Sequence, residues 1–270
     1  MQTVLTIAGF DPSGGAGVLA DIKTSAAFGC FGAAAITSLT SQNTRGVFAT
    51  FHQSAEVLRA QLVPILTDYD IAAVKIGMLP TVELIEVVIE ILVQRTLPNI
   101  VLDPVLQSSS GFALMDDAAR KLLLEKLLPL TNVVTPNLNE VEAMLGTKPT
   151  TVEEMQIAAQ QLSEQLSQHK SVAVLVKGGH LPNEATDVLF ADNALHSFTT
   201  AKLSSRHTHG TGCTLSSAIA ALLAQNCALP EAVERAKNYV TGAIINAPTI
   251  GQGAGPLNHF YNYVAKSPYL

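Results

Sequence analysis

The chain has 270 residues, of which 48% are hydrophobic and 14% are charged, and its formal net charge is -6. This composition predicts a well-filled core and excludes an intrinsically disordered chain, while the acidic balance argues against nucleic acid as a partner. The three cysteines, Cys30, Cys213 and Cys227, are widely spaced and form no C-x-x-C pair. We therefore expect reduced thiols rather than a disulfide framework or a zinc site.

The sequence has no feature of a membrane or secreted protein. It opens directly on a strand-like run without a signal-like segment, and no stretch reaches transmembrane length. No Pro-, Gly- or Ser-rich segment is long enough to link two domains. We expect a cytoplasmic protein without membrane contact, with a single domain over residues 1–270.

Short apolar runs alternate with longer helical stretches, which is typical of an α/β fold with a mostly parallel central sheet flanked by helices. Strands are predicted at 4–8, 72–76, 100–102, 133–134 and 172–176. Helices are predicted at 17–27, 55–66, 82–94, 117–127, 138–145, 152–168, 211–225 and 231–247. Between the apolar runs 188–191 and 195–199, Asp192 and Asn193 predict a hairpin turn.

The loops that follow the predicted strands are the first places to look for a site. Open α/β sheets bind ligands beyond the carboxyl ends of their strands. The loops concerned follow Ala8, Ile76, Leu102, Val134 and Val176.

A glycine-rich corner precedes the predicted helix 211–225. Gly210 and Gly212 remove side chains where the helix begins, so the free N–H groups of its first turn can bind a phosphoryl oxygen. A thiolate at Cys213 would be stabilised by the same helix end and could act as a base or nucleophile. On spacing alone, a tight turn with Cys213 as a core residue is an equally good interpretation.

Two common nucleotide-binding patterns are absent. The chain has no G-x-x-x-x-G-K-[ST] motif and no G-x-G-x-x-G after its first strand, which argues against a P-loop NTPase and a Rossmann dehydrogenase.

The segment 209–214, His-Gly-Thr-Gly-Cys-Thr, closely resembles the carboxy-terminal signature of the ribokinase-like superfamily in its vitamin kinase branch. The segment 8–17, Ala-Gly-Phe-Asp-Pro-Ser-Gly-Gly-Ala-Gly, resembles the opening of the hydroxymethylpyrimidine/phosphomethylpyrimidine kinases of thiamine biosynthesis. Between them, the segments 42–44, 75–78, 102–105, 135–140 and 176–180 occur in the family's order. The resemblance implies a three-layer ribokinase-like fold and a homodimer.

The resemblance further implies ATP-dependent phosphorylation of 4-amino-5-hydroxymethyl-2-methylpyrimidine and of its monophosphate to the diphosphate. The implied pyrimidine pocket consists of Gly9, Ala16, Asp21, Gln42, Met78 and Val105. Gln42 and Asp21 are the expected polar readers, because an amide donates and accepts and a carboxylate accepts hydrogen bonds from an aminopyrimidine. Alternatively, Asp21 interacts with a helix dipole and Met78 is a core residue.

The resemblance also assigns a nucleotide end. It places Lys177, Gly179 and Asn137 at ATP, and Asp103 and Glu140 at Mg²⁺, which needs only one or two carboxylates beside phosphate oxygens. Alternatively, Asn137 caps the following helix and Glu140 completes a capping box, and both roles are compatible.

The implied mechanism is an in-line attack of the substrate hydroxyl oxygen on the γ-phosphorus, with Cys213 as general base. The first-turn segment Gly210, Thr211 and Gly212 would stabilise the developing charge. Sugar kinases of the superfamily typically carry aspartate at the position of Cys213, so cysteine favours a vitamin substrate. We expect structural roles for His180, His207 and His209, which lack metal-ligand spacing.

Two alternatives remain open, a pyridoxal or pyridoxine kinase and a catalytically silent pyrimidine-binding sensor. Two departures from the family pattern bear on substrate range. The loop 107–110 lacks the lysine that many relatives have before a Ser-Gly pair, and Phe10 stands where relatives often have a small or polar residue.

Overall fold

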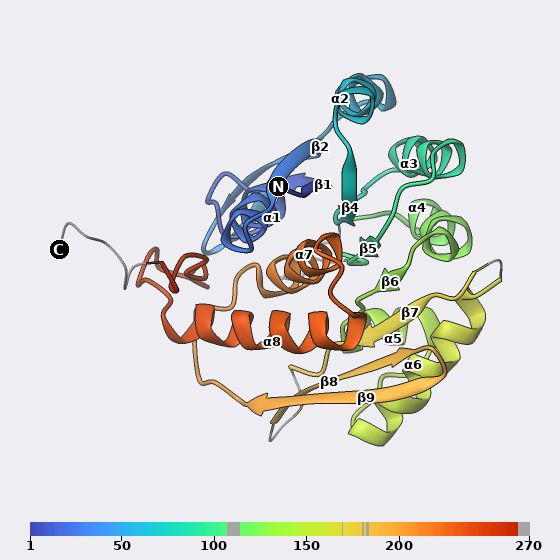
Figure 1. The fold of residues 1–270 in the computed structure, drawn as a ribbon. Helices are drawn as coiled ribbons and strands as arrows, with labels where there is room; N and C mark the ends of the chain where they lie inside the picture. The colour runs from blue at the N-terminus through green and yellow to red at the C-terminus, as the bar shows by residue number, and fades with distance from the viewer. Residues whose placement is uncertain (107–113, 169, 180, 182–183, 264–270) are drawn as a thin grey trace.

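The computed structural model describes residues 1–106, 114–168, 170–179, 181 and 184–263. Over these residues, one sheet of nine strands is covered on both faces by helices, which gives a three-layer α/β/α arrangement (Figure 1). The strand order is β3-β2-β1-β4-β5-β6-β7-β8-β9. The α/β architecture expected from the sequence is therefore confirmed.

The sheet is mixed, and the expectation of a mostly parallel sheet was wrong. The strands are β1 (Thr3–Phe10), β2 (Phe31–Asn43), β3 (Gly46–His52), β4 (Ile71–Ile76), β5 (Ile100–Leu102), β6 (Val133–Val134), β7 (Ala173–Val176), β8 (Glu184–Ala191) and β9 (Ala194–Ala201). Neighbours from β2 to β7 are parallel, whereas β3 pairs antiparallel with β2, and β8 and β9 extend the other edge antiparallel. Short connections impose these antiparallel pairs, because only a longer crossover can return a chain to a parallel neighbour.

The predicted hairpin joins β8 to β9. Asp192 and Asn193 have φ angles of 49° and 59°, the left-handed region that both residues of a tight primed turn adopt. The sequence pattern did not predict β2 or β3.

The helices lie close to their predicted positions. They are α1 (Gly17–Ala27), α2 (Ala55–Asp68), α3 (Val82–Gln94), α4 (Asp117–Leu122), α5 (Leu138–Leu145), α6 (Val152–Leu166), α7 (Thr211–Ala224) and α8 (Leu229–Ile245). The predicted helix 117–127 is α4 followed by a π-helical turn, η1 (Leu123–Leu127), and a 3₁₀ turn, η2 (Leu128–Leu130). None of the described helices is long and apolar enough to cross a membrane.

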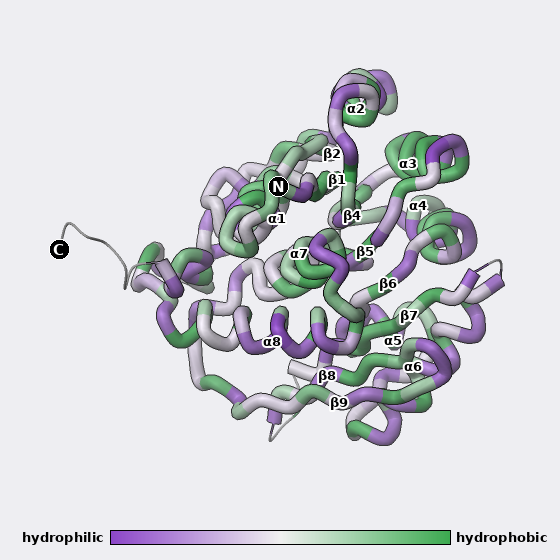
Figure 2. Tube along the Cα trace, in the orientation of Figure 1, coloured by the Kyte–Doolittle hydropathy of each residue, from purple (hydrophilic) through white to green (hydrophobic). Residues whose placement is uncertain are grey.

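The core has two parts, one on each face of the sheet. Leucine, isoleucine and valine side chains of α2, α3 and α6 fill one part, and α7 and α8 close the other. Figure 2 shows hydrophobic residues concentrated along β7 and α3. Every residue of α7 from Thr214 to Ala224 is buried, and most are small, so the helix packs closely against the sheet, α1 and α8.

Candidate active site

A cleft of about 1130 Å³ lies at the carboxyl ends of β1, β4, β5, β6 and β7, where the sequence predicted a site. All the expected site residues line it except Asp21. The expected residues that line the cleft are Gly9, Ala16, Gln42, Met78, Val105, Asp103, Asn137, Glu140, Lys177, Gly179, Gly210, Thr211, Gly212 and Cys213. Residues that are far apart in the sequence thus come together at one edge of the sheet.

The glycine corner is the start of α7. Gly210 caps the helix with a φ of 81°, and a Cβ atom at this position would lie 1.9 Å from the carbonyl oxygen of Gly15. Only glycine fits this conformation and this close approach. The amides of Gly212 and Cys213 belong to the first helical turn, whose N–H groups have no acceptor within the helix. The corner therefore presents backbone donors to the cleft.

A lysine and a carboxylate face this corner. Lys177 Nζ lies 2.5 Å from Asp103 Oδ1, which also accepts a hydrogen bond of 3.0 Å from Thr135 Oγ1. A Cβ atom on Gly212 would lie 3.2 Å from Asp103 Oδ2 and 3.4 Å from Lys177 Nζ. Burial alone would lower the pKa of Lys177, but Asp103 and Glu140 raise it above its ordinary value. The start of α7 thus lies beside Lys177, which stays protonated.

The Glu140 carboxyl group both caps a helix and lies buried near other charged groups. Its Oε2 accepts a 2.7 Å hydrogen bond from the Asn137 amide, and Asn137 Oδ1 accepts from the Glu140 amide, so the capping box is confirmed. Burial raises the pKa of Glu140 to about 7; Lys177 lowers it, and the nearby Asp103 raises it further. This carboxyl group is therefore only partly ionised at neutral pH.

Cys213 is a partly buried thiol rather than a stabilised thiolate. Burial raises its pKa, and Asp21 and Asp103 add to this effect, whereas Lys75 and the Gly17 amide oppose it. The helix N-terminus favours a thiolate at this position, but loss of solvation is the largest influence on the pKa and opposes it. The thiol is therefore protonated at neutral pH.

Asp21 lies behind the cleft and holds a lysine that sequence reasoning missed. Its Oδ2 contacts Lys75 Nζ at 2.9 Å and accepts a 2.6 Å hydrogen bond from Thr6, while Oδ1 accepts one of 2.7 Å from Ser217. Lys75 is fully buried yet borders the cleft, and Asp21 is 1% exposed. A charged residue inside the apolar strand β4 was the available signal for Lys75. With three partners already in place, the Asp21 carboxylate does not face a ligand in the cleft.

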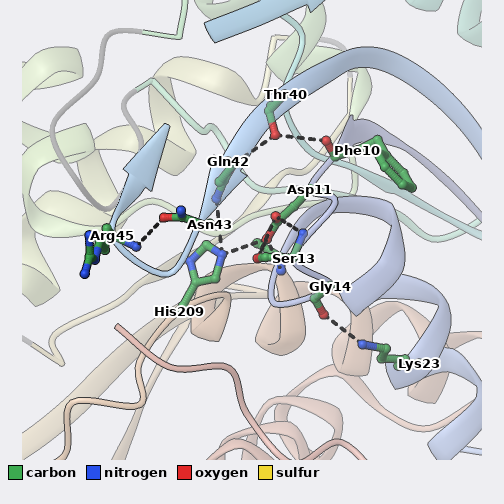
Figure 3. A network of polar contacts seen from close by, with 11 residues as sticks. Phe10, Asp11, Ser13, Gly14, Lys23, Thr40, Gln42, Asn43, Arg45 and His209 are labelled. Carbon is green, nitrogen blue, oxygen red and sulfur yellow. Dashed lines mark hydrogen bonds and ion pairs between the residues drawn. The ribbon is translucent and has the colours of Figure 1, made fainter. Parts of the chain in front are cut away.

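The other end of the cleft carries a polar network around Gln42 (Figure 3). His209 Nε2 lies 2.7 Å from Asp11 Oδ2 and 3.2 Å from the Gln42 side-chain amide. Hydrogen bonds from His209 and Ser13 lower the pKa of Asp11, although burial, the largest single influence, would raise it. The expected structural role of His209 thus includes direct contact with an expected substrate reader.

The apolar wall of this end comes from Gly9, Met78 and Val105. A Cβ atom on Gly9 would lie 3.0 Å from Met78 Sδ, so the glycine makes room for this thioether. Phe10 also lines the cleft. The loop 107–110 and His180 lie outside the described residues.

The sheet with helices on both faces, and the glycine-started helix facing Lys177 and Asp103, place the protein in the class of ribokinase-like vitamin kinases. The structure resembles Bacillus subtilis pyridoxal kinase in its ADP complex, with a TM-score of 0.88 and 33% identity over 98% of this chain and 99% of that one. It also resembles Clostridium difficile phosphomethylpyrimidine kinase, with a TM-score of 0.79 and 38% identity over 90% of this chain and 100% of that one.

Comparison of sequences identifies the family more narrowly than comparison of structures. Residues 11–258 match the family model of phosphomethylpyrimidine kinase. The Rhizobium meliloti hydroxymethylpyrimidine/phosphomethylpyrimidine kinase is 46% identical over 96% of this chain and 97% of its own length. The chain belongs to the phosphomethylpyrimidine kinase family and is a phosphotransferase.

Proposed function

We propose that this protein transfers the γ-phosphoryl group of ATP to the hydroxymethyl group of 4-amino-5-hydroxymethyl-2-methylpyrimidine. It then phosphorylates the monophosphate to the diphosphate, as a step of thiamine biosynthesis. Family membership supports the reaction, and the relative with bound ADP supports ATP as co-substrate. The observation that carries the proposal is the first turn of α7 facing Lys177 and Asp103, with Gln42 at the other end of the same cleft.

Each part of the cleft has a distinct task in this proposal. Lys177 binds phosphate oxygens, and the amides of Gly212 and Cys213 donate to the oxygens on which charge develops. These groups are fixed before the substrate arrives, so little reorganisation is needed during the transfer. Gly179 and Asn137 line the nucleotide end, where the open space at Gly179 admits a ligand close to the backbone.

The residues present fit a magnesium ion. Asp103 and Glu140 are 3% and 5% exposed, and burial, with a smaller contribution from Asp103, raises the pKa of Glu140 to about 7. A cation held by these carboxylates would favour their ionised forms. Two carboxylates are enough for this ion, because Mg²⁺ keeps several waters and takes phosphate oxygens as further ligands. Bound between these carboxylates and ATP, Mg²⁺ would neutralise phosphate charge.

Cys213 is the proposed general base. Its thiol must lose a proton before it can accept one from the substrate hydroxyl, and its raised pKa opposes this loss. The Lys75 ammonium group lowers the pKa of Cys213 and so favours the thiolate. We assign Lys75 the role of maintaining positive charge beside the thiol, and Asp21 the role of holding Lys75.

A substrate assay tests this function. Purified protein with Mg-ATP and the hydroxymethylpyrimidine is followed by ADP release and by mass spectrometry of the mono- and diphosphates. We expect both products in sequence, and a large loss of both in Cys213→Ala. Absence of a phosphorylated pyrimidine would overturn the proposal. Binding of the pyrimidine without ATP consumption would favour the silent sensor, which membership of a kinase family disfavours.

Pyridoxal kinase activity is the second candidate, and one observation favours it. The structural resemblance to Bacillus subtilis pyridoxal kinase extends over 98% of this chain. Parallel assays with pyridoxal and the aminopyrimidine at equal concentrations separate the two candidates. Turnover of pyridoxal alone would reassign the substrate.

We also propose that the protein is a cytoplasmic homodimer. The edge strand β3 carries Phe48 and Phe51, which are 64% and 61% exposed, and Leu39 pairs with Phe51 across β2 and β3. An exposed apolar edge strand is a liability unless another chain covers it. Light scattering of the wild-type protein and of a Phe48→Ser/Phe51→Ser variant tests this assembly; a wild-type monomer would overturn it.

A further inference from the structure

The polar network around Gln42 determines which of its atoms carry protons. Asp11 is 3% exposed, and its lowered pKa keeps it ionised at neutral pH, so its carboxylate only accepts hydrogen bonds. His209 Nε2 lies 2.7 Å from Asp11 Oδ2. A contact of this length requires a proton on His209 Nε2, whether the imidazole is neutral or charged.

The proton on His209 Nε2 selects one orientation of the Gln42 amide. A protonated Nε2 has no lone pair in the ring plane with which to accept, and its single proton points mainly at Asp11. The Gln42 atom 3.2 Å away can therefore interact favourably only as the second, weaker acceptor of a three-centre hydrogen bond. In the orientation drawn in Figure 3, the amide nitrogen faces His209, and two donors would oppose each other. A half-turn of the amide exchanges its oxygen and nitrogen with little change in shape. The hydrogen bonds therefore require the Gln42 oxygen toward His209.

Thr40 supports the same orientation independently. Its hydroxyl lies 3.1 Å from the Phe10 carbonyl oxygen and 3.1 Å from the other end of the Gln42 amide. The hydroxyl has one proton, which the Phe10 carbonyl takes, because that oxygen cannot donate in return. After the half-turn one Gln42 N–H group donates to Thr40 Oγ1, and no two donors in the network oppose each other.

The His209 imidazole is held in place by a hydrogen bond of the His209 backbone and by the space that Gly15 leaves for the ring. A Cβ atom on Gly15 would lie 2.3 Å from His209 Cδ2, so the ring occupies space that only a glycine leaves free. The His209 amide donates to the Gly255 carbonyl oxygen at 3.2 Å. Asp11 is fixed in turn, since its carboxylate accepts from the Ser13 and Ala16 amides at 2.9 and 3.0 Å.

We propose that His209 and Asp11 are positioning residues that lock the Gln42 amide with its oxygen toward the imidazole and its nitrogen toward Thr40. This inference rests on the proposed function. The lock leaves Gln42 with one N–H group and one oxygen lone pair in a fixed order along the cleft. An aminopyrimidine, with an exocyclic amine beside a ring nitrogen, offers the matching donor and acceptor, whereas a ring without that amine does not.

The test compares two ligands and several variants. The ligands are the aminopyrimidine and its analogue without the 4-amino group, and the readout is the KM of the analogue divided by the KM of the aminopyrimidine, with kcat measured separately. We expect His209→Ala and Asp11→Asn each to lower this ratio by about tenfold, with kcat for the aminopyrimidine within about threefold of wild type, because one positioned hydrogen bond is lost. His209→Gln, which retains an N–H donor, should restore part of the preference.

Controls separate positioning from general damage. In a Gln42→Ala background, His209→Ala should change the ratio by less than about twofold, because the residue through which it acts is absent. His52→Ala is the matched control, since His52 has a 2.8 Å contact with Ser38 and does not line the cleft. Thr40→Val breaks the network at its other end and replaces His209→Ala if that variant fails to fold.

A measurement without substrate decides the proton position. Nitrogen-15 spectra of the wild-type protein distinguish a protonated from an unprotonated His209 Nε2. A protonated nitrogen together with a lowered ratio in the variants supports the proposal. An unprotonated Nε2, or an unchanged ratio in both His209→Ala and Asp11→Asn, overturns it. If the wild-type protein does not phosphorylate the aminopyrimidine, the proposed function and the recognition role fail together, while the spectra still report the amide orientation.

Discussion

Replacement of Lys75 by methionine should destabilise the protein strongly. The lysine is 0% exposed, and its partner Asp21 is 1% exposed. Methionine fills much of the same volume but leaves the Asp21 charge buried, with only the hydroxyl groups of Thr6 and Ser217 as donors. Removal of one partner from a buried ion pair typically costs about 3–5 kcal/mol. For 270 residues, an unfolding entropy of about 2.1 cal/mol/K per residue converts this cost into a fall in Tm of about 5–9 °C.

Circular dichroism during heating measures this change, with urea unfolding as a second method. Burial would lower the pKa of Lys75, but attraction to Asp21, Cys213 and Asp103, together with the hydrogen bond to Asp21, raises it above its ordinary value. The stabilisation is therefore complete below the unfolded-state pKa of about 10.4 and is lost only as the pH rises through the higher folded-state pKa. The Tm difference should stay constant between about pH 6 and pH 9.

Two further variants complete the experiment. Asp21→Asn/Lys75→Met removes both charges and should recover much of the lost stability, since no charge stays buried alone. Arg59→Met breaks the exposed Arg59–Glu90 pair, whose contact is 2.7 Å, and should have little effect on Tm because solvent screens it. The reasoning would be refuted by an unchanged Tm in Lys75→Met, or by a double variant less stable than the single one.

Three other predictions concern the nucleotide end and the base. Gly210→Ala should abolish activity and lower Tm, because its Cβ atom would lie 1.9 Å from the Gly15 carbonyl oxygen; an active enzyme with the wild-type Tm would contradict this. The rate should increase as the pH rises above neutral, because deprotonation of Cys213 passes through its raised pKa, and Cys213→Ala should lack this increase in a pH–rate profile. The apparent affinity for Mg²⁺ should weaken as the pH falls below about 7, where Glu140 becomes protonated, whereas Glu140→Gln should bind Mg²⁺ weakly at every pH in activity titrations.

The helices and the inner strands could be predicted from the sequence because their signals are local. Thr151 accepts from the Glu154 amide at the start of α6, and Asn137 caps α5, as their residue types indicate. Strand β2 gave no such signal. Its stretch from Phe31 to Asn43 mixes small and polar residues, and its pairing with β1 and β3 determines its conformation.

Site residues that belong to a sequence motif could be predicted. Contacts between distant segments of the chain were missed. The cleft residues at strand ends followed from the fold class and the resemblance. The Lys75–Asp21 pair joins residues 54 positions apart, and the His209–Asp11 contact joins residues 198 positions apart. No spacing rule connects such pairs, because only the folded sheet brings them together. The pKa of Cys213 could not be predicted for the same reason, since its desolvation depends on the packing of the whole cleft.

The complete burial of α7 has a consequence for motion. A helix enclosed along its length from Thr214 to Ala224 cannot tilt or slide without disrupting the core on one face of the sheet. The amides at its start are therefore a fixed reference point for the reaction. Any movement that brings the two substrates together must therefore involve the other walls of the cleft. Substitutions that change the substrate range are better sought in those walls, at Gln42 and Val105.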